Sequence, residues 1–453
     1  MPSKTNNLAR NGCIALVLIL ANCSMFAQTN AVGIFKNHAD IGHPKNAGTS
    51  RYDEATQTYI LRGSGYNIWF NRDEFQYAYN KIGGDFILTA NFEFLGDQGN
   101  GHRKTGWMIR ESTDEGAAHF SAVTHGDGLT VFQWRPLRGA YMRDPEDEIF
   151  FAKKVPFQTI QLERSGRKIT MRVANRGEPL QEVGSQEMQY MRDSVLAGLF
   201  ISSHDSNRVE EAMVWNVRID KPVPTNYSPN PQIQRTLPRA QPILDCRLET
   251  MNVFDGKRKV ILESTGRLES PDWMPDGSKL LFKQNGVLHT IPVEGGTPQE
   301  LHTDTASKNV HTVTTKKGVA LTANVTGRVD GPEHSPDGKY VYYNANPSGT
   351  MQIWRMRPDG SGKEQMTFDE YHNWFPHISP DSKWIAFISA PADIDPDSLP
   401  SYKQVTLRLM PALGGAPRVI AYLYGGQGTM KENSWSPDSK HIAFVSNSEQ
   451  AVK

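Results

Sequence analysis

Apolar residues recur at every second position in several short segments of the N-terminal half of the chain. Between residues 86 and 94, Phe86, Leu88, Ala90, Phe92 and Phe94 alternate with residues that are mostly polar. A period of two places the first set on one face of a β-strand, turned toward a core. The pattern therefore predicts a strand that is buried on one side.

A second alternation surrounds a glycine-containing turn. Ile160 and Leu162 precede the turn at residues 164–168, and apolar residues at 169, 171 and 173 follow it. Two alternating runs around a short glycine turn predict a β-hairpin.

Two further apolar segments also predict β-strands. Residues 195–201 form a continuous apolar run, as in a strand buried on both faces, and Trp215, Val217 and Ile219 are expected to share one strand face. Short strands without convincing helical periods predict a β-sandwich over residues 28–219. Proline-rich residues 220–241 are expected to be a linker, because proline fits neither a central strand nor a helix interior.

A turn motif recurs four times in residues 242–453. A Pro-Asp pair is followed by Gly or Ser, then by an exposed Lys within the next two positions and by a strand of alternating apolar residues. Proline presets such a turn, and aspartate bonds to nearby backbone amides. A single unit cannot bury both of its faces, so the repeats predict blades of a β-propeller. The repeat aspartates, expected to be structural, are Asp276, Asp337, Asp381 and Asp438.

These repeats resemble the TolB-like β-propellers (PD40 or WD40-like repeats), including a bacterial subgroup labelled as biopolymer transporters. The resemblance implies a ring of about six blades, whereas residues 242–453 supply about four and a half. The ring is expected to close with strands at 244–252 and 259–264, and residues 310–323 are expected to give the half blade. Residues 102–110 and 123–129 make the first domain similar to a concanavalin-like sandwich of the DUF1349 type.

The first 27 residues are predicted to be a signal peptide, because a basic start precedes an apolar run too short to span a bilayer. The protein is therefore expected in the periplasm or at the cell surface, with a lipid anchor at Cys23 as a minority alternative. No later segment reaches membrane length. Cys246, the one cysteine beyond the signal, is interpreted as a small core residue.

Composition and motifs argue against several functions. Lys plus Arg and Asp plus Glu both number 49, so a basic footprint for nucleic acid is missing. No Gly-x-Ser-x-Gly elbow, phosphate-binding loop or zinc spacing occurs, and residues 393–404 lack the glycine and glutamate of a calcium loop. No cofactor and no metal are expected, and the prediction leans toward a protein that is not an enzyme.

The main hypothesis is an exported, non-catalytic binding protein. Its sandwich would hold carbohydrate or a similar ligand, and its propeller would make protein contacts, for example with an envelope partner. The alternatives are a glycoside hydrolase or lyase with non-standard residues, and a component of a TolB-like envelope transport complex. The ordinary interpretation of Trp134 is a core residue, and that of the histidines is strand-end caps. The candidate ligand-binding residues are Trp69, Arg110, His125, Asp127, Trp134 and His204.

Overall fold

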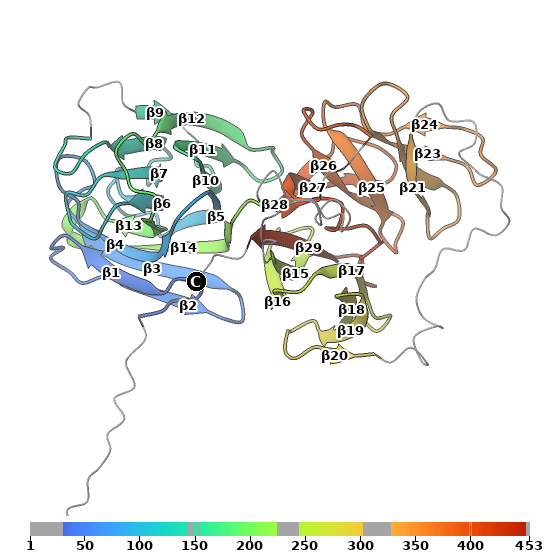
Figure 1. The fold of residues 1–453 in the computed structure, drawn as a ribbon, viewed down its shortest axis with the longest axis horizontal. Coiled ribbons are helices and arrows are strands. Elements are labelled where there is room, and N and C mark those ends of the chain that lie inside the picture. The colour runs from blue at the N-terminus through green and yellow to red at the C-terminus, as the bar shows by residue number, and fades with distance from the viewer. Residues whose placement is uncertain are drawn as a thin grey trace, which may run out of the picture.

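The computed structural model describes residues 30–142, 149–152, 155–223, 244–301, 328–397, 399 and 401–449. These residues form 29 β-strands and no helix, so the fold is all-β. The predicted signal peptide, Cys23 and residues 224–241 of the predicted linker lie outside the described residues. Figure 1 shows a β-sandwich and a β-propeller side by side. Within the described part of the chain, no helix is long and apolar enough to cross a membrane.

The sandwich consists of two antiparallel sheets of seven strands each. The first sheet has the order β1 (Asn37–Ile41), β4 (Phe75–Ile82), β13 (Val195–Ser202), β6 (Lys104–Arg110), β7 (His119–His125), β8 (Thr130–Arg135) and β9 (Ile149–Phe151). The second has the order β12 (Gln181–Glu187), β11 (Lys168–Ala174), β10 (Thr159–Ser165), β5 (Phe86–Leu95), β14 (Asp205–Asp220), β3 (Thr58–Gly65) and β2 (Thr49–Asp53).

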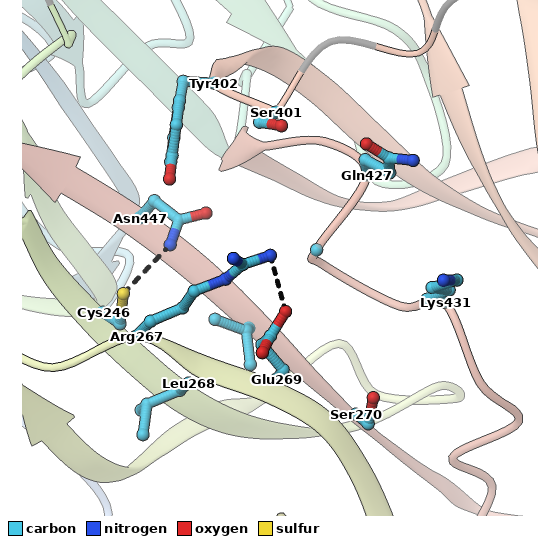
Figure 2. Close-up of a pocket in the computed structure, with 12 residues that line it drawn as sticks. Cys246, Arg267, Leu268, Glu269, Ser270, Ser401, Tyr402, Gln427, Lys431 and Asn447 are labelled. Carbon is cyan, nitrogen blue, oxygen red and sulfur yellow. Dashed lines mark hydrogen bonds and ion pairs between the residues drawn. The ribbon is translucent and has the colours of Figure 1, made fainter. Parts of the chain in front are cut away.

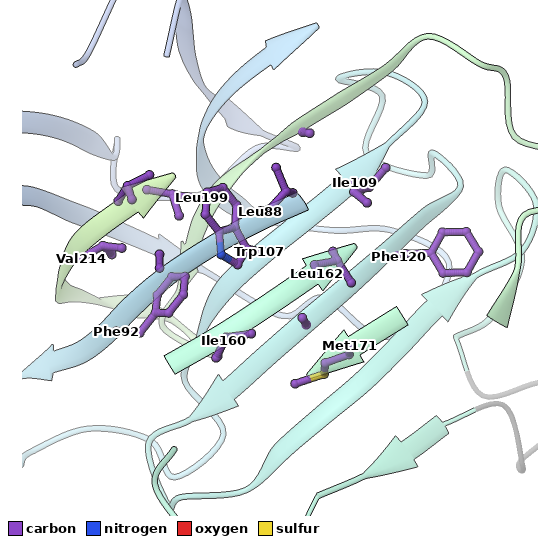
Figure 3. Close-up of a cluster of buried hydrophobic side chains, with 14 of the residues drawn as sticks. Leu88, Phe92, Trp107, Ile109, Phe120, Ile160, Leu162, Met171, Leu199 and Val214 are labelled. Carbon is purple, nitrogen blue, oxygen red and sulfur yellow. The ribbon is translucent and has the colours of Figure 1, made fainter. Parts of the chain in front are cut away.

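The core between the two sheets follows the alternation seen in the sequence. Leu88 and Phe92 from β5 are buried against Ile160 and Leu162 from β10 and Trp107 from β6 (Figure 3). The predicted hairpin is confirmed, because β10 pairs with β11 from Thr159–Ala174 to Ser165–Lys168. Large apolar side chains that interdigitate from both sheets supply most of the stabilisation of such a sandwich.

The outer face of the first sheet carries a second apolar cluster. The segment at residues 66–74 contributes Ile68 to this cluster, and Phe75, Tyr77 and Phe200 belong to it. The carboxylate of Asp73, which precedes β4, is buried between two arginines of the sheet. Arg135 contacts it at 2.6 and 2.7 Å and Arg110 at 3.1 Å, so these charges fasten the segment to the sheet.

The propeller domain contains four blades within the described residues. The first has three strands, β15 (Leu244–Asn252), β16 (Arg258–Ser264) and β29 (His441–Glu449). The other three have four strands each: β17 (Leu268–Trp273), β18 (Lys279–Gln284), β19 (Val287–Pro292) and β20 (Gln299–Glu300); β21 (Val329–His334), β22 (Val341–Ala345), β23 (Gln352–Met356) and β24 (Glu364–Gln365); β25 (His372–Ile378), β26 (Trp384–Ala390), β27 (Lys403–Pro411) and β28 (Arg418–Gly425).

The first blade joins both ends of the propeller sequence. β15 pairs with β29 from Leu244–Glu449 to Asn252–His441 and with β16 on its other side. The prediction that strands at 244–252 and 259–264 complete the blade of the last repeat is therefore confirmed. The predicted half blade at 310–323 lies outside the described residues.

The repeated turns connect neighbouring blades. Each repeat aspartate accepts a backbone N–H two residues later, at 3.0–3.1 Å. In addition, the N–H of Asp337 donates to Ser382 Oγ at 3.2 Å, and the N–H of Asp381 donates to Ser439 Oγ at 3.1 Å. Both serines have positive φ, 58° and 61°, where the other two repeats have glycine. Each of these serines thus has an unfavourable backbone conformation, and its side chain forms a hydrogen bond between blades.

A buried charge cluster joins the two domains. Glu249 of β15 is completely buried and accepts from Arg218 of β14 at 2.5 and 3.1 Å and from Arg258 of β16 at 2.8 and 3.2 Å. Ser446 donates to the same carboxylate at 2.5 Å. Because Arg218 belongs to the sandwich and the other residues to the propeller, the domains share a polar core.

Candidate binding cleft between the domains

Two of the predicted ligand-binding residues are not accessible. Trp134 has only 3% of its surface exposed and packs among Phe132 and Phe150 in the sandwich core. Arg110 is fully buried, and its guanidinium is held by Asp73 and by backbone oxygens. We therefore remove Trp134 and Arg110 from the ligand-binding set, because Trp134 packs between the two sheets and Arg110 is enclosed by Asp73 and backbone oxygens.

The other four predicted residues lie in two places. Trp69 is partly buried and packs against the apolar cluster on the outer face of the first sheet. His125, Asp127 and His204 gather at one end of that sheet, where the charge of Asp127 acts on His125 and His204 lies close to Lys104. Among the described residues, no group of three or more His, Cys, Asp or Glu is arranged to hold a metal ion.

A larger cavity lies elsewhere, between the two domains. It is a cleft of about 1050 Å³ that is open to solvent. The outer face of the second sheet forms one wall, and the propeller blades that contain β16, β17 and β29 form the other. The sandwich wall includes Thr58, Ile60, Met213 and Trp215, and the propeller wall includes Lys257, Lys259, Trp273, Val293 and His441.

Trp215 lines the cleft through the regular alternation of β14, in which Ala212 and Val214 face the core. A β-bulge follows directly, because the pairing of β14 with β5 shifts register between Trp215 and Arg218, and Asn216 has a φ of 53°. The bulge brings Val217 to the core face as well. The expectation that Trp215 and Val217 share one face is therefore wrong, since strict alternation fails at a bulge.

The bulge residue also attaches the sandwich to the propeller. The side-chain amide of Asn216 donates to the carbonyl of Gly256 at 3.0 Å and accepts from the N–H of Arg258 at 3.1 Å. Gln57 makes the same two-way contact with the backbone of Val260, at 3.0 and 2.9 Å. These paired bonds hold the two walls in one register and place the indole of Trp215 opposite the propeller.

Trp273 differs from the tryptophan at the equivalent repeat position. Trp435 is buried, and its indole N–H donates to the carbonyl of His377 at 3.0 Å. Trp273 is partly buried against the apolar cluster of its blade, and its buried Nε1 has no hydrogen-bond partner within the described part of the chain. It also lines the cleft beside His441, with ring centroids 6.1 Å apart. The packing that repeat position predicts therefore holds for both residues, but Trp273 is also part of the cleft wall.

Several carboxylates line the same cleft as the two indoles. Asp53, Glu93, Asp255, Asp276 and Asp438 all line the cleft. A hydrogen bond from the backbone N–H of Thr56 lowers the pKa of Asp53, and one from Ser278 lowers that of Asp276, so both carboxylates are ionised at neutral pH.

The cleft has fewer basic residues than carboxylates, and two of the basic residues already form ion pairs. Lys259 contacts Glu294 at 2.6 Å and Arg258 contacts Glu249. The walls therefore offer flat apolar faces next to hydrogen-bond acceptors, which is the chemistry that hydroxyl-rich ligands require.

A second, smaller pocket of about 160 Å³ lies within the propeller (Figure 2). Cys246 lines it and accepts a hydrogen bond from the side-chain amide of Asn447 at 3.2 Å, while Arg267 pairs with Glu269 at 2.6 Å. Burial raises the pKa of the Cys246 thiol, so the thiol stays protonated. These features agree with a packing role for Cys246 rather than with a nucleophile.

Similar proteins match mainly one half of the chain at a time. No known protein-family profile matches the chain. An uncharacterised protein of Agrobacterium fabrum is 28% identical, over 44% of this chain and 91% of its own length. A solved structure from Agrobacterium tumefaciens, provisionally described as TolB, is 26% identical over 45% of this chain and 98% of its own, with a TM-score of 0.35.

Lectin I of Ulex europaeus, solved with a methyl fucoside, is 8% identical over 39% of this chain and 95% of its own, with a TM-score of 0.26. Over less than half of its length, the chain is thus similar in sequence to a TolB-like propeller. The likeness to the DUF1349 type stays a prediction. The strand order and blade closure described above are what establish the all-β, two-domain fold.

Proposed function

We propose that the protein is an exported, non-catalytic binding protein that holds a carbohydrate chain in the cleft between its two domains. The observation that carries the proposal is the pair of indoles, Trp215 from the sandwich and Trp273 from the propeller, in one open cleft of about 1050 Å³. Small-molecule sites usually measure about 300–1,000 Å³, so the cleft has room for several sugar rings.

The chemistry of the walls fits a saccharide better than a purely apolar ligand. Indole faces stack on the apolar faces of sugar rings, and carboxylates accept hydrogen bonds from hydroxyl groups. The ligand class is the one expected from the sequence, but the proposed site is the cleft, because Trp134 and Arg110 are buried whereas Trp215 and Trp273 are only partly buried.

The propeller is also proposed to contact an envelope protein, which copurification from membranes would test.

The experiment measures binding of the mature full-length chain to a panel of polysaccharides and their oligosaccharides, by affinity electrophoresis and calorimetry. Replacing either indole, Trp215→Ala or Trp273→Ala, is expected to weaken binding about tenfold, equivalent to about 1.4 kcal/mol. Trp69→Ala is the matched control, since Trp69 lies on the other face of the sandwich.

Three results would contradict the proposal. The first is failure to bind any polysaccharide. The second is a loss of binding in Trp69→Ala together with none in the two cleft variants. The third, release of reducing sugars from a bound polymer, would retain the site but make the protein an enzyme.

A further inference from the structure

A group of basic side chains lies at one end of the first sheet, away from the cleft. Lys104 begins β6 and pairs across the strands with His125, the last residue of β7, and with Ser202 of β13. His204 follows β13, and His102 precedes Lys104 in the chain. Strand register therefore brings one lysine and three histidines together from three different chain segments.

Within the described residues, Lys104 is a buried cation without a counter-charge. Only 3% of its surface is exposed, and its ammonium contacts Asn67 Oδ1 at 3.0 Å, the carbonyl of His102 at 3.0 Å and Nδ1 of His204 at 3.2 Å. All three partners are neutral acceptors. No carboxylate of the described residues forms an ion pair with Lys104, although a buried charge is costly unless it is paired.

The other buried cations of the described chain behave differently. Every arginine that is buried to a similar degree contacts a carboxylate, from the Arg103–Glu210 pair at 2.7 Å to the Arg408–Asp369 pair at 2.6 Å. The remaining arginines in this group are Arg110, Arg135, Arg164, Arg218, Arg247, Arg258 and Arg355. Lys104 is thus the exception to a rule that the rest of the described structure follows.

The three imidazoles add donors to the same place. Nδ1 of His102 and Nδ1 of His125 lie 3.4 Å apart, and the rings of His102 and His204 lie 5.4 Å apart. His125 is 7% exposed, and its Nε2 is buried without a hydrogen-bond partner. His102 is exposed and His204 partly so, which leaves the group open to solvent on one side.

Lys104 carries the positive charge of the group, beside the neutral imidazoles of His125 and His204. Burial, followed by the charge of Lys104, lowers the pKa of His125 to about 3 and that of His204 to about 4. Burial also lowers the pKa of Lys104 to about 8. His102 acts in the same direction on both histidines. Asp127 acts in the opposite direction on His125, but one of its oxygens accepts the N–H of Leu129 at 3.0 Å.

We infer that Lys104, His102, His125 and His204 form a binding site for an oxyanion, that is, a carboxylate, sulfate or phosphate group. Such a group supplies the missing counter-charge for Lys104 and accepts hydrogen bonds from imidazole N–H groups. A metal cation is disfavoured, because the ammonium of Lys104 already occupies Nδ1 of His204 and would repel it. The site is separate from the cleft and does not depend on what the cleft binds.

Anion binding should be linked to proton uptake. A bound negative charge favours the protonated imidazoles, so it raises their pKa values from the low values of the free protein. Between pH 5 and 6 binding should therefore take up protons and tighten as the pH falls. Calorimetry in two buffers with different ionisation enthalpies measures this uptake directly.

The test uses the full-length mature protein with sodium sulfate, sodium glucuronate, glucose and sodium chloride at equal ionic strength. Sulfate or glucuronate is expected to bind with proton uptake, whereas glucose and chloride are not. Binding of glucuronate but not sulfate would identify an acidic saccharide as the source of the anion. Binding of sulfate alone would identify a free or sulfated oxyanion.

Lys104→Gln removes the charge and retains groups that can bond Asn67 and His204, and it should weaken anion binding at least about tenfold. His125→Gln should reduce the proton uptake. Lys45→Gln is the matched control, because Lys45 is an exposed lysine that contacts Asn207. The inference is overturned if no oxyanion binds, or if Lys104→Gln binds as tightly as Lys45→Gln. Trp215→Ala should leave anion binding unchanged, which separates this inference from the proposed function.

Discussion

Glu249→Gln is expected to destabilise the whole two-domain protein. The substitution keeps the size of the side chain but leaves the guanidinium groups of Arg218 and Arg258 buried without a negative partner. Four hydrogen bonds from these arginines, at 2.5–3.2 Å, lose their charged acceptor. Removing one partner of a buried ion pair typically costs about 3–5 kcal/mol, and two arginines are affected here, so we expect about 4 kcal/mol or more.

The free energy of unfolding should be measured by urea denaturation, followed by tryptophan fluorescence. The matched control is Glu263→Gln, because Glu263 in β16 is 65% exposed and lies 3.5 Å from Arg247. Because Glu263 is largely exposed and Arg247 keeps Asp220 as a second carboxylate partner at 2.5 Å, this interaction is worth about 0–1 kcal/mol. If the two variants differ by less than about 1 kcal/mol, the cluster at Glu249 does not hold the domains together.

The same carboxylate should make stability depend on pH. Burial by itself would raise the pKa of Glu249, but the charges of Arg218 and Arg258 outweigh it and hold the pKa well below the usual 4.5. A depressed pKa contributes stability that is complete above pH 4.5 and is lost as the pH falls toward the folded value. The wild-type protein should therefore lose stability below pH 4.5, and Glu249→Gln should lack that part of the loss.

Three further outcomes are expected from the same denaturation assay. Ser439→Ala should cost about 0.5–1.5 kcal/mol through the lost bond between blades, and Ser439→Gly should be about 1 kcal/mol more stable than Ser439→Ala, because glycine tolerates the φ of 61°; equal stabilities would count against the strain. Asp73→Asn should cost about 3–5 kcal/mol, since it leaves Arg110 and Arg135 buried without a carboxylate, and a loss below about 1 kcal/mol would disprove that role. For His125, whose pKa of about 3 lies below the ordinary 6.5, stability is present above pH 6.5 and declines as the pH falls toward 3. His125→Gln should flatten that decline, and an unchanged pH profile would show that the imidazole is not buried in its neutral form.

The sequence by itself determined the features that depend on neighbours along the chain. The alternation at residues 86–94 was enough to identify the buried face of β5, because side chains in a regular strand point to opposite faces in turn. The four Pro-Asp turns predicted the blades, because each aspartate bonds to a backbone amide only two residues away. The count of strands at the two ends also predicted the blade that joins β15 and β16 to β29.

Only the tertiary structure decided which side chains form the sites. Trp134 and Trp215 look equivalent in sequence, yet Trp134 faces the core whereas Trp215 faces the cleft, because Val214 takes the core side of β14. The bulge at Asn216 then brings Val217 to the core as well. Lys104 gave no signal in the sequence, since its isolation becomes visible only when every possible carboxylate partner has a position. The physical reason is the distance along the chain over which each feature is determined. Strand periodicity and turns depend on interactions within a few residues. Burial and charge pairing depend on segments that are far apart in the sequence and are brought together by folding.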